Sequence, residues 1–156
     1  MFKKILVANR GEIAVRIIRA CKELNIKTVA IHSNVDTEAM HVKLADESIC
    51  VGSALPNESY LNIPSIVSAI DITGADAVHP GYGFLSENDK FAKILSSHKV
   101  KFIGPTSKSI LELGNKSNAL KLASDFKLPI LGNKNSKNID NTSDAQKIAK
   151  EIGMPV

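Results

Sequence analysis

The sequence predicts an α/β fold in which helices cover both faces of a doubly wound, mostly parallel sheet. Strand-like and helix-like patterns alternate along most of the chain, which is typical of sheets built from right-handed crossovers. The strand candidates are short and apolar at nearly every position, as strands buried on both faces should be. The chain of 156 residues is 44% hydrophobic and 23% charged, so it can bury a sizeable core.

The first strand is expected at residues 4–8, where apolar residues follow one another, and the first helix at 12–24. In that helix apolar residues recur at helical spacing, which predicts one buried and one polar face. Further strands are expected at 28–32 and 48–51, where β-branched residues are frequent. A helical stretch at 37–45 separates them.

The alternation continues through a helix at 64–70, a strand at 75–79, a helix at 89–96 and a strand at 100–103. After these elements only helical patterns remain, so a domain boundary is expected between residues 105 and 114.

Three helices are expected beyond that boundary, at 107–113, at 117–126 and from Ser143 to residue 152. Thr106 can cap the first, and Gly114 stands where a left-handed C-cap is expected. Residues 143–146 have the form of a capping box. Residues 153–156 look like the start of a strand, which predicts that the chain is the opening part of a longer protein.

Composition argues against several classes of protein. The net charge of +4 comes mainly from lysines after residue 105 that have no aromatic residues interleaved, so a nucleic-acid surface is not expected. The apolar run at 5–8 is too short for a signal peptide or a membrane span, which predicts a cytoplasmic protein without membrane contact. Cys21 and Cys50 lack metal-type spacing, so both are expected to be reduced and buried.

Residues 79–88 form a candidate site loop with the sequence HPGYGFLSEN. Pro80 fixes its own backbone, and Gly81 and Gly83 can adopt positive φ and let the backbone approach a ligand. The loop follows a strand, at the edge where open α/β sheets bind ligands. The simpler interpretation is a tight turn with Ser86 or Asn88 as the N-cap of the next helix.

The first strand-to-helix turn, residues 8–12, lies where a dinucleotide-binding fold carries its glycine-rich loop. Here Gly11 is the only glycine and Glu12 would repel phosphate, so a dinucleotide site is not expected. No two of the four histidines stand at metal-ligand spacing, and no metal site is predicted from protein residues. For His79, an imidazole at a strand end is more often a structural hydrogen-bonding group than a catalytic one.

The ten residues 79–88 closely resemble the HPGYGFLSEN signature of the biotin carboxylase family. Residues 8–14, ANRGEIA, and 19–30 resemble two further segments of that family, and the resemblance is weakest from 127 to 144. It implies a Rossmann-like N-terminal domain over residues 1–113. It also implies the truncated beginning of an ATP-grasp domain over residues 114–156.

The resemblance also implies site residues. In the family this loop lies beside the pocket where biotin and bicarbonate meet, so Tyr82 and Gly83 are expected as biotin-side contacts, with His79 and Glu87 beside them. From the residues alone, Glu87 could equally be an acid at a helix N-terminus. Lys116 matches the lysine of the family's GDK segment, which lies against the phosphates of ATP. No catalytic residue is expected among these 156.

At the neighbouring position the sequence has Asn115 where the family usually has Asp, which weakens any role for a carboxylate there. The family dimerises through the region of the first helix. Its polar face, with Arg16, Arg19 and Glu23, is therefore expected to be a dimer interface.

The implied activity is that of an ATP-dependent ligase. ATP with Mg²⁺ or Mn²⁺ would activate bicarbonate, and the carboxyl group would pass to biotin on a biotin carboxyl carrier protein or domain. A carboxyltransferase component would then use it, as in acetyl-CoA carboxylase and fatty acid biosynthesis or in related carboxylases. The family's glycine-rich loop, metal-binding acids and catalytic base lie after residue 156, so the chain alone is expected not to turn over ATP.

Two alternatives belong to other classes. The chain could be a non-catalytic α/β module that binds a partner or dimerises, or part of another ATP-grasp ligase, such as a carbamoyl-phosphate or glycinamide ligase. The HPGYGFLSEN segment argues against the second alternative, because those relatives carry different residues there. The acceptor of the carboxyl group would be chosen by a different subunit or domain.

Overall fold

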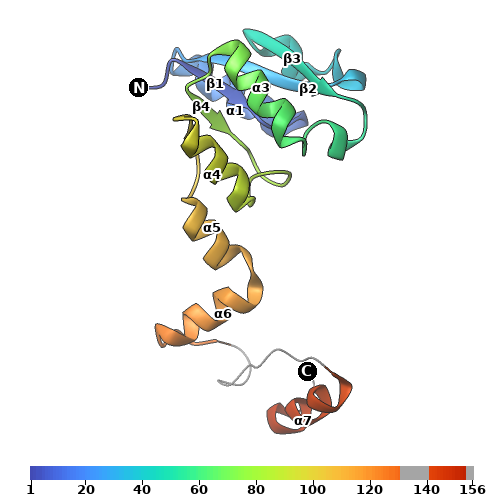
Figure 1. Ribbon diagram of the computed structural model, residues 1–156, viewed down its shortest axis with the longest axis vertical. Helices are drawn as coiled ribbons and strands as arrows, with labels where there is room; N and C mark the ends of the chain where they lie inside the picture. The colour runs from blue at the N-terminus through green and yellow to red at the C-terminus, as the bar shows by residue number, and fades with distance from the viewer. Residues whose placement is uncertain (131–140, 154–156) are drawn as a thin grey trace. The chain divides into compact units, whose positions relative to one another are not determined.

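Five parallel strands form one sheet in the computed structural model, which describes residues 1–130 and 141–153 (Figure 1). The strands are β1 Lys4–Val7, β2 Lys27–Ser33, β3 Glu47–Gly52, β4 Ala77–His79 and β5 Lys101–Phe102. They confirm the predicted doubly wound parallel sheet. The chain divides into two compact units, Met1–Ile110 and Leu111–Val156, and the sheet belongs to the first.

The strand order is β3-β2-β1-β4-β5, so the chain starts in the middle of the sheet and builds outward twice. After β3 it returns to the other side of β1 and adds β4 and β5. The direction of winding therefore reverses between β1 and β4, which pair with Val7 opposite His79. The backbone N–H of Ala8 donates to the carbonyl of His79 at 2.9 Å, which holds the two strand ends together.

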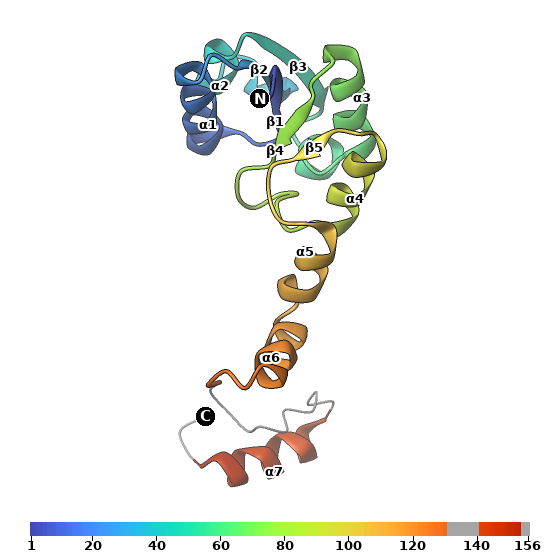
Figure 2. The same ribbon diagram turned by 90° about the vertical axis from the view of Figure 1, so that its left-hand side faces the viewer.

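Helices cover both faces of the sheet (Figure 2). Helices α1 (Gly11–Glu23) and α2 (Met40–Leu44) lie on one side, and α3 (Ile63–Thr73) and α4 (Asp89–Ser97) on the other. Two short 3₁₀ helices, η1 (Asn34–Asp36) and η2 (Pro56–Glu58), follow β2 and β3.

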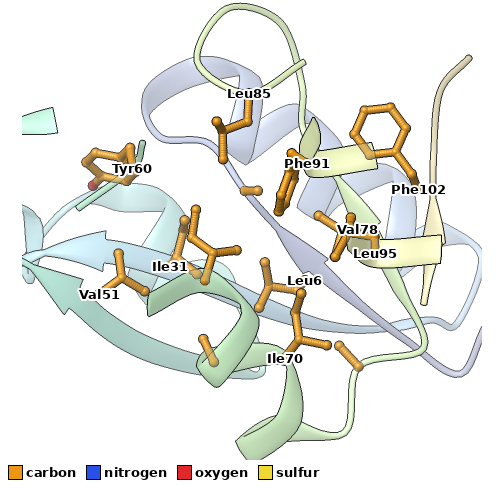
Figure 3. Close-up of a cluster of buried hydrophobic side chains, with 14 of the residues drawn as sticks. Leu6, Ile31, Val51, Tyr60, Ile70, Val78, Leu85, Phe91, Leu95 and Phe102 are labelled. Atoms are coloured by element: carbon orange, nitrogen blue, oxygen red, sulfur yellow. The ribbon is translucent and has the colours of Figure 1, made fainter. Parts of the chain in front are cut away.

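Alternating residues of each strand face opposite helix layers, so two separate cores form. On the α1 side Ile5 and Val7 pack with the buried face of α1. On the other side Leu6 and Val78 pack against α3 and α4, and Phe91 meets Phe102 edge to face at 6.1 Å between ring centroids (Figure 3).

The edge strand β3 corrects one prediction. Cys21 is buried in α1, where burial raises the pKa of its thiol, but Cys50 is exposed. The expectation that both cysteines are buried is wrong for Cys50, because β3 borders solvent and only alternate residues such as Ile49 and Val51 turn toward the core. An apolar run therefore does not show whether a strand is central or at the edge.

The helix ends in the first unit follow ordinary capping chemistry. Asn62 caps α3 and Asn88 caps α4, each through a side-chain oxygen that accepts a backbone N–H. Gly74 ends α3 in the left-handed conformation with φ of 65°.

The second unit contains the end of α5 (Ser107–Gly114), α6 (Lys116–Asp125) and α7 (Thr142–Ile152). Thr106 accepts the N–H of Ser109 at 3.1 Å, so its predicted cap is confirmed. Gly114 is not left-handed; it stays in α5, because Asn115 immediately begins the next helix as its N-cap.

The predicted capping box of α7 is displaced in the structure. Asn141, rather than Ser143, is the N-cap, and its Oδ1 accepts the N–H of Asp144 at 2.9 Å. The Asn141 side-chain amide in turn donates to the Asp144 carboxylate at 2.8 Å, which makes this cap reciprocal. The strand start expected at 153–156 falls largely outside the described residues.

We expect Asp46 to make stability depend on acid pH. Its carboxylate accepts hydrogen bonds from the N–H and the hydroxyl of Thr28, both at 2.9 Å, and pairs with Lys27 at 3.1 Å. Burial alone would raise its pKa, but these partners lower it to about 2. Because this lies below the unfolded value of about 3.9, the stabilisation is present above that pH and is lost as the pH falls toward 2.

The variant Asp46→Asn should therefore lose less stability than the parent chain between about pH 5 and pH 2. We expect a difference of about 1 kcal/mol, because the side chain is 27% exposed and solvent screens its interactions. Urea unfolding at several pH values measures it, with Asp71→Asn on the exposed surface of α3 as the matched control. Identical pH profiles for parent and Asp46→Asn would contradict the prediction.

Candidate functional site

The candidate site lies at the carboxyl ends of β1 and β4, where the winding of the sheet reverses. Open α/β sheets bind ligands at such points, since the loops that leave the two strands turn in opposite directions. Here the loop of residues 79–88 leaves β4, and the turn with Asn9 and Arg10 leaves β1. Segments that are far apart in the sequence thus meet at one edge of the sheet.

The backbone of the loop has the special conformations that the glycines predict. Gly81 and Gly83 have φ of 65° and 66°, and Phe84 has φ of 41°, which is uncommon for a residue with a side chain. A Cβ at Gly81 would lie 2.8 Å from Nδ2 of Asn9. Gly81 is therefore needed both for its φ and for the close approach of Asn9.

Asn9 is a site residue that sequence reasoning did not single out. It is 3% exposed, and its Nδ2 donates to the carbonyls of Pro80 at 2.7 Å and Tyr82 at 2.8 Å. Its Oδ1 accepts the N–H of Arg10 at 2.9 Å. The sequence signal for Asn9 is an amide side chain just after a central strand. Its hydrogen-bond partners, however, can be predicted only once the strand order is known.

Tyr82 stands on the outside of the loop with 59% of its surface exposed. Its hydroxyl donates to the carboxylate of Glu12, and this hydrogen bond raises the pKa of the phenol. Gly83 and Glu87 are also exposed, and Glu87 directly precedes the cap of α4. Three of the four predicted loop residues are therefore open to solvent.

His79 is half-buried and is hydrogen-bonded to the backbone of its own loop. Its Nδ1 accepts the N–H of Gly81 at 3.0 Å, so the proton of the neutral ring is on Nε2. Burial lowers the pKa of this imidazole. The ring also lines an apolar groove of about 550 Å³ between α1 and the sheet, together with Ile13, Ile17 and Ile103.

An aromatic and charged cluster holds Phe84, the residue after Gly83. The Phe84 ring stacks on Tyr60 at 5.3 Å, and the Arg10 guanidinium lies 5.1 Å and 5.7 Å from the centroids of the Tyr60 and Phe84 rings. The Tyr60 hydroxyl donates to Asp36 at 2.6 Å. Burial and the hydrogen bond to Asp36 raise the pKa of Tyr60 to about 12, so it stays protonated.

Asp36 is the anionic centre of that cluster. Partial burial alone would raise its pKa, but hydrogen bonds from Tyr60, Ser33 and Arg10 lower it overall. The Ser33 hydroxyl lies 2.7 Å from the Asp36 carboxylate and the Arg10 guanidinium 3.4 Å from it. Asp36 therefore remains charged at neutral pH and orients both Arg10 and Tyr60.

The remaining predicted residues lie on two helices. Arg16, Arg19 and Glu23 are exposed on α1, as their helical spacing predicts, and Arg16 pairs loosely with Glu12 at 3.7 Å. In the second unit Lys116 is the exposed first residue of α6, which Asn115 caps by accepting the N–H groups of Ser117 and Asn118. Asn115 thus performs the capping role that an aspartate could also fill.

Within residues 1–130 and 141–153, no three His, Cys, Asp or Glu side chains are grouped so that they could hold a metal ion. Within the same ranges, no helix is both long enough and apolar enough to cross a membrane.

Comparison with known families and curated proteins gives consistent matches. The family described as "Biotin carboxylase, N-terminal domain" matches residues 1–110. The chain is 49% identical over 156 residues to the biotin carboxylase of Haemophilus influenzae, and covers 35% of that protein. It is 51% identical over 155 residues to the human mitochondrial propionyl-CoA carboxylase alpha chain, and covers 21% of it. The chain thus spans about a third of the curated biotin carboxylases that it matches.

Solved structures match over nearly the whole chain as well. The complex of the Campylobacter jejuni biotin carboxylase with a βγ-ATP compound superposes with a TM-score of 0.93 at 45% identity, covering 99% of this chain and 34% of that one. The biotin carboxylase domain dimer of the Hydrogenobacter thermophilus 2-oxoglutarate carboxylase, in complex with MgADP, ADP and bicarbonate, superposes with a TM-score of 0.92 at 46% identity. It has the same coverage of both chains.

Proposed function

Since this chain belongs to the biotin carboxylase N-terminal domain family, we propose that it is the N-terminal part of an enzyme that carboxylates biotin with ATP and bicarbonate. The observation that carries the proposal is the loop of residues 79–88. It lies at the reversal of the sheet, its backbone is fixed, and it presents Tyr82 and Gly83 to solvent. This is how a scaffold would offer one wall of a small-molecule pocket.

In this proposal Tyr82 and Gly83 contact the biotin side of the pocket, and Glu87 lies on the same exposed edge. His79 supports the loop by accepting the N–H of Gly81, and burial lowers the pKa of its ring. Tyr82 offers an apolar ring and a hydroxyl, a combination suited to a polar ureido ring fused to an apolar tetrahydrothiophene ring.

We propose that residues 114–156 begin an ATP-grasp domain and that Lys116 contacts the phosphates of ATP. A compact ammonium at the first position of α6 suits a polyphosphate, because the N–H groups of the helix start add to its positive potential. Bound Mg²⁺ would neutralise phosphate charge during phosphoryl transfer. We assign no magnesium ligand to the part of the chain that the structure describes.

The proposed partners are a biotin carboxyl carrier protein or domain, a carboxyltransferase component and a second copy of this chain. Dimers occur in at least one relative, the 2-oxoglutarate carboxylase domain, which supports the homodimer. The fatty acid pathway, the cytoplasmic location and the inactivity of the chain alone remain predictions.

The direct test uses the complete enzyme of which we propose this chain to be the N-terminal part. ATP hydrolysis should require bicarbonate and should accelerate on addition of free biotin, with carboxybiotin as a product. Hydrolysis that is indifferent to biotin, or that carboxylates no biotin, would exclude the proposed reaction and favour another ATP-grasp ligase.

We expect the polar face of α1 to act in dimerisation. Reversing one charge with Arg19→Glu in the complete enzyme should raise the dimer dissociation constant about tenfold or more, because a reversed charge within an interface removes its electrostatic complementarity. Sedimentation velocity over a range of concentrations measures it. Lys93→Glu, an equal charge reversal at an exposed position of α4 on the other side of the sheet, is the control, and equal dimer constants for both variants would contradict the prediction.

A further inference from the structure

The exposed part of the loop, Tyr82 and Gly83, is held by contacts at two points. The first is Asn9, which binds the carbonyls of Pro80 and Tyr82. The second is Phe84, whose ring stacks on Tyr60 beside the guanidinium of Arg10. Asn9 and Arg10 are consecutive residues at the end of β1, so one short turn reaches both points.

The Asn9 contact uses every polar atom of a buried side chain. Both amide hydrogens are donated to the loop, and Oδ1 accepts the N–H of Arg10. Asn9 is only 3% exposed, so no water would replace the amide without rearrangement. The Cβ that any other residue would place at Gly81 would lie 2.8 Å from Nδ2 of Asn9, which makes the fit between the two residues specific.

The Arg10 contact holds a backbone conformation that is otherwise unfavourable. Phe84 has a positive φ of 41°, which costs free energy for a residue with a Cβ. Stacking on Tyr60 and the adjacent cation offset that cost. Asp36 fixes the arrangement by accepting hydrogen bonds from Arg10 and from Tyr60.

These contacts exceed what attachment of the loop to the core requires. Leu85 already buries its side chain in the core, toward Phe91 (Figure 3), and Asn88 already caps α4. Asn9 instead binds the carbonyls on either side of Gly81, in the part of the loop that leads to the exposed Tyr82. The contacts therefore determine the position of the exposed segment rather than its attachment.

We infer that Asn9 and Arg10 are positioning residues that hold Tyr82 and Gly83 in the geometry required to receive biotin. The kinetic part of this inference rests on the proposed function, whereas the structural part does not. Neither residue touches the ligand; each acts through the loop backbone or through Phe84.

The structural part is tested by amide hydrogen exchange of the 156-residue chain. Asn9→Ala should speed exchange of the Gly81 and Ser86 amides about tenfold or more, because two loop carbonyls lose their partners. Asn62→Ala is the matched control, since it removes the side-chain cap of α3 far from the loop. Unchanged exchange in Asn9→Ala, or equal acceleration in Asn62→Ala, would overturn the inference.

The kinetic part is tested in the complete enzyme with Asn9→Ala and with Arg10→Lys, which retains the charge toward Asp36 but loses the planar group against the rings. Both should lower kcat/KM for biotin about tenfold, while the KM for ATP stays within about twofold. Equal losses toward both substrates would show a merely structural role and overturn the inference. A parent enzyme that carboxylates no biotin would contradict the proposed function, and hydrogen exchange would still decide whether Asn9 holds the loop.

Discussion

Replacing Gly52 with alanine should destabilise the chain by about 3 kcal/mol or more, the largest effect on stability that we expect from a single methyl group. Gly52 ends β3 with φ of 153°, and a Cβ there would lie 1.8 Å from the carbonyl oxygen of Glu58. That oxygen belongs to the backbone at the end of η2, so no side-chain rotation can relieve the overlap. The η2 segment or the end of β3 would have to move.

Urea unfolding followed by far-UV circular dichroism measures the loss. Gly74→Ala is the matched control, because Gly74 also has positive φ, at 65°, but nothing lies within 4 Å of the position that an added methyl group would take. It should cost only about 1 kcal/mol, the ordinary penalty for a left-handed residue with a Cβ. If the two variants lost equal stability, the proximity of the Glu58 carbonyl to Gly52 would not be the cause of the loss.

The sheet could be predicted from the sequence because its signal is local. Each central strand is a short apolar run, and the apolar residues that form the buried face of α1 recur at helical spacing. Strand order is not local, and it decides burial at the edge. The prediction that Cys50 is buried is therefore wrong, although the strand that contains it is predicted correctly.

The candidate site shows the same contrast between features that local sequence predicts and features that depend on strand order. The positive φ of Gly81 and Gly83 follows from residue type, and both were expected. The role of Asn9 required knowing that β1 and β4 are neighbours, since its partner Pro80 is 71 positions away. A polar residue directly after a central strand becomes interpretable only once the adjacent strand is known.

The predictions of two helix ends were wrong for a different reason, which is that neighbouring residues compete as helix caps. Gly114 can end a helix, but Asn115 can begin one, and the structure uses Asn115. Near α7, residues 143–146 have the sequence of a capping box with Ser143 as the N-cap. In the structure Asn141, two positions earlier, is the N-cap and accepts a hydrogen bond from the N–H of Asp144. Asparagine and serine are similarly good caps, so local chemistry alone does not rank such neighbours.

Lys116→Gln in the complete enzyme should weaken ATP binding by about 1.5 to 3 kcal/mol, as expected when a charged hydrogen-bond donor to phosphate is lost. The KM for ATP should therefore rise about tenfold or more, while the KM for biotin stays near its original value. Folding should hardly change, because Lys116 is exposed and a cation in the first turn of α6 gains nothing from the helix dipole.

Steady-state kinetics with each substrate varied in turn measures both constants. Lys93→Gln, the same loss of charge at an exposed position of α4, controls for the change in overall charge. Binding through Lys116 requires that only Lys116→Gln raises the KM for ATP. If both variants raised the KM for ATP equally, the ammonium would be acting at a distance through net charge. In that case, or if biotin saturation changed instead of the KM for ATP, the assignment of Lys116 to the phosphates would be wrong.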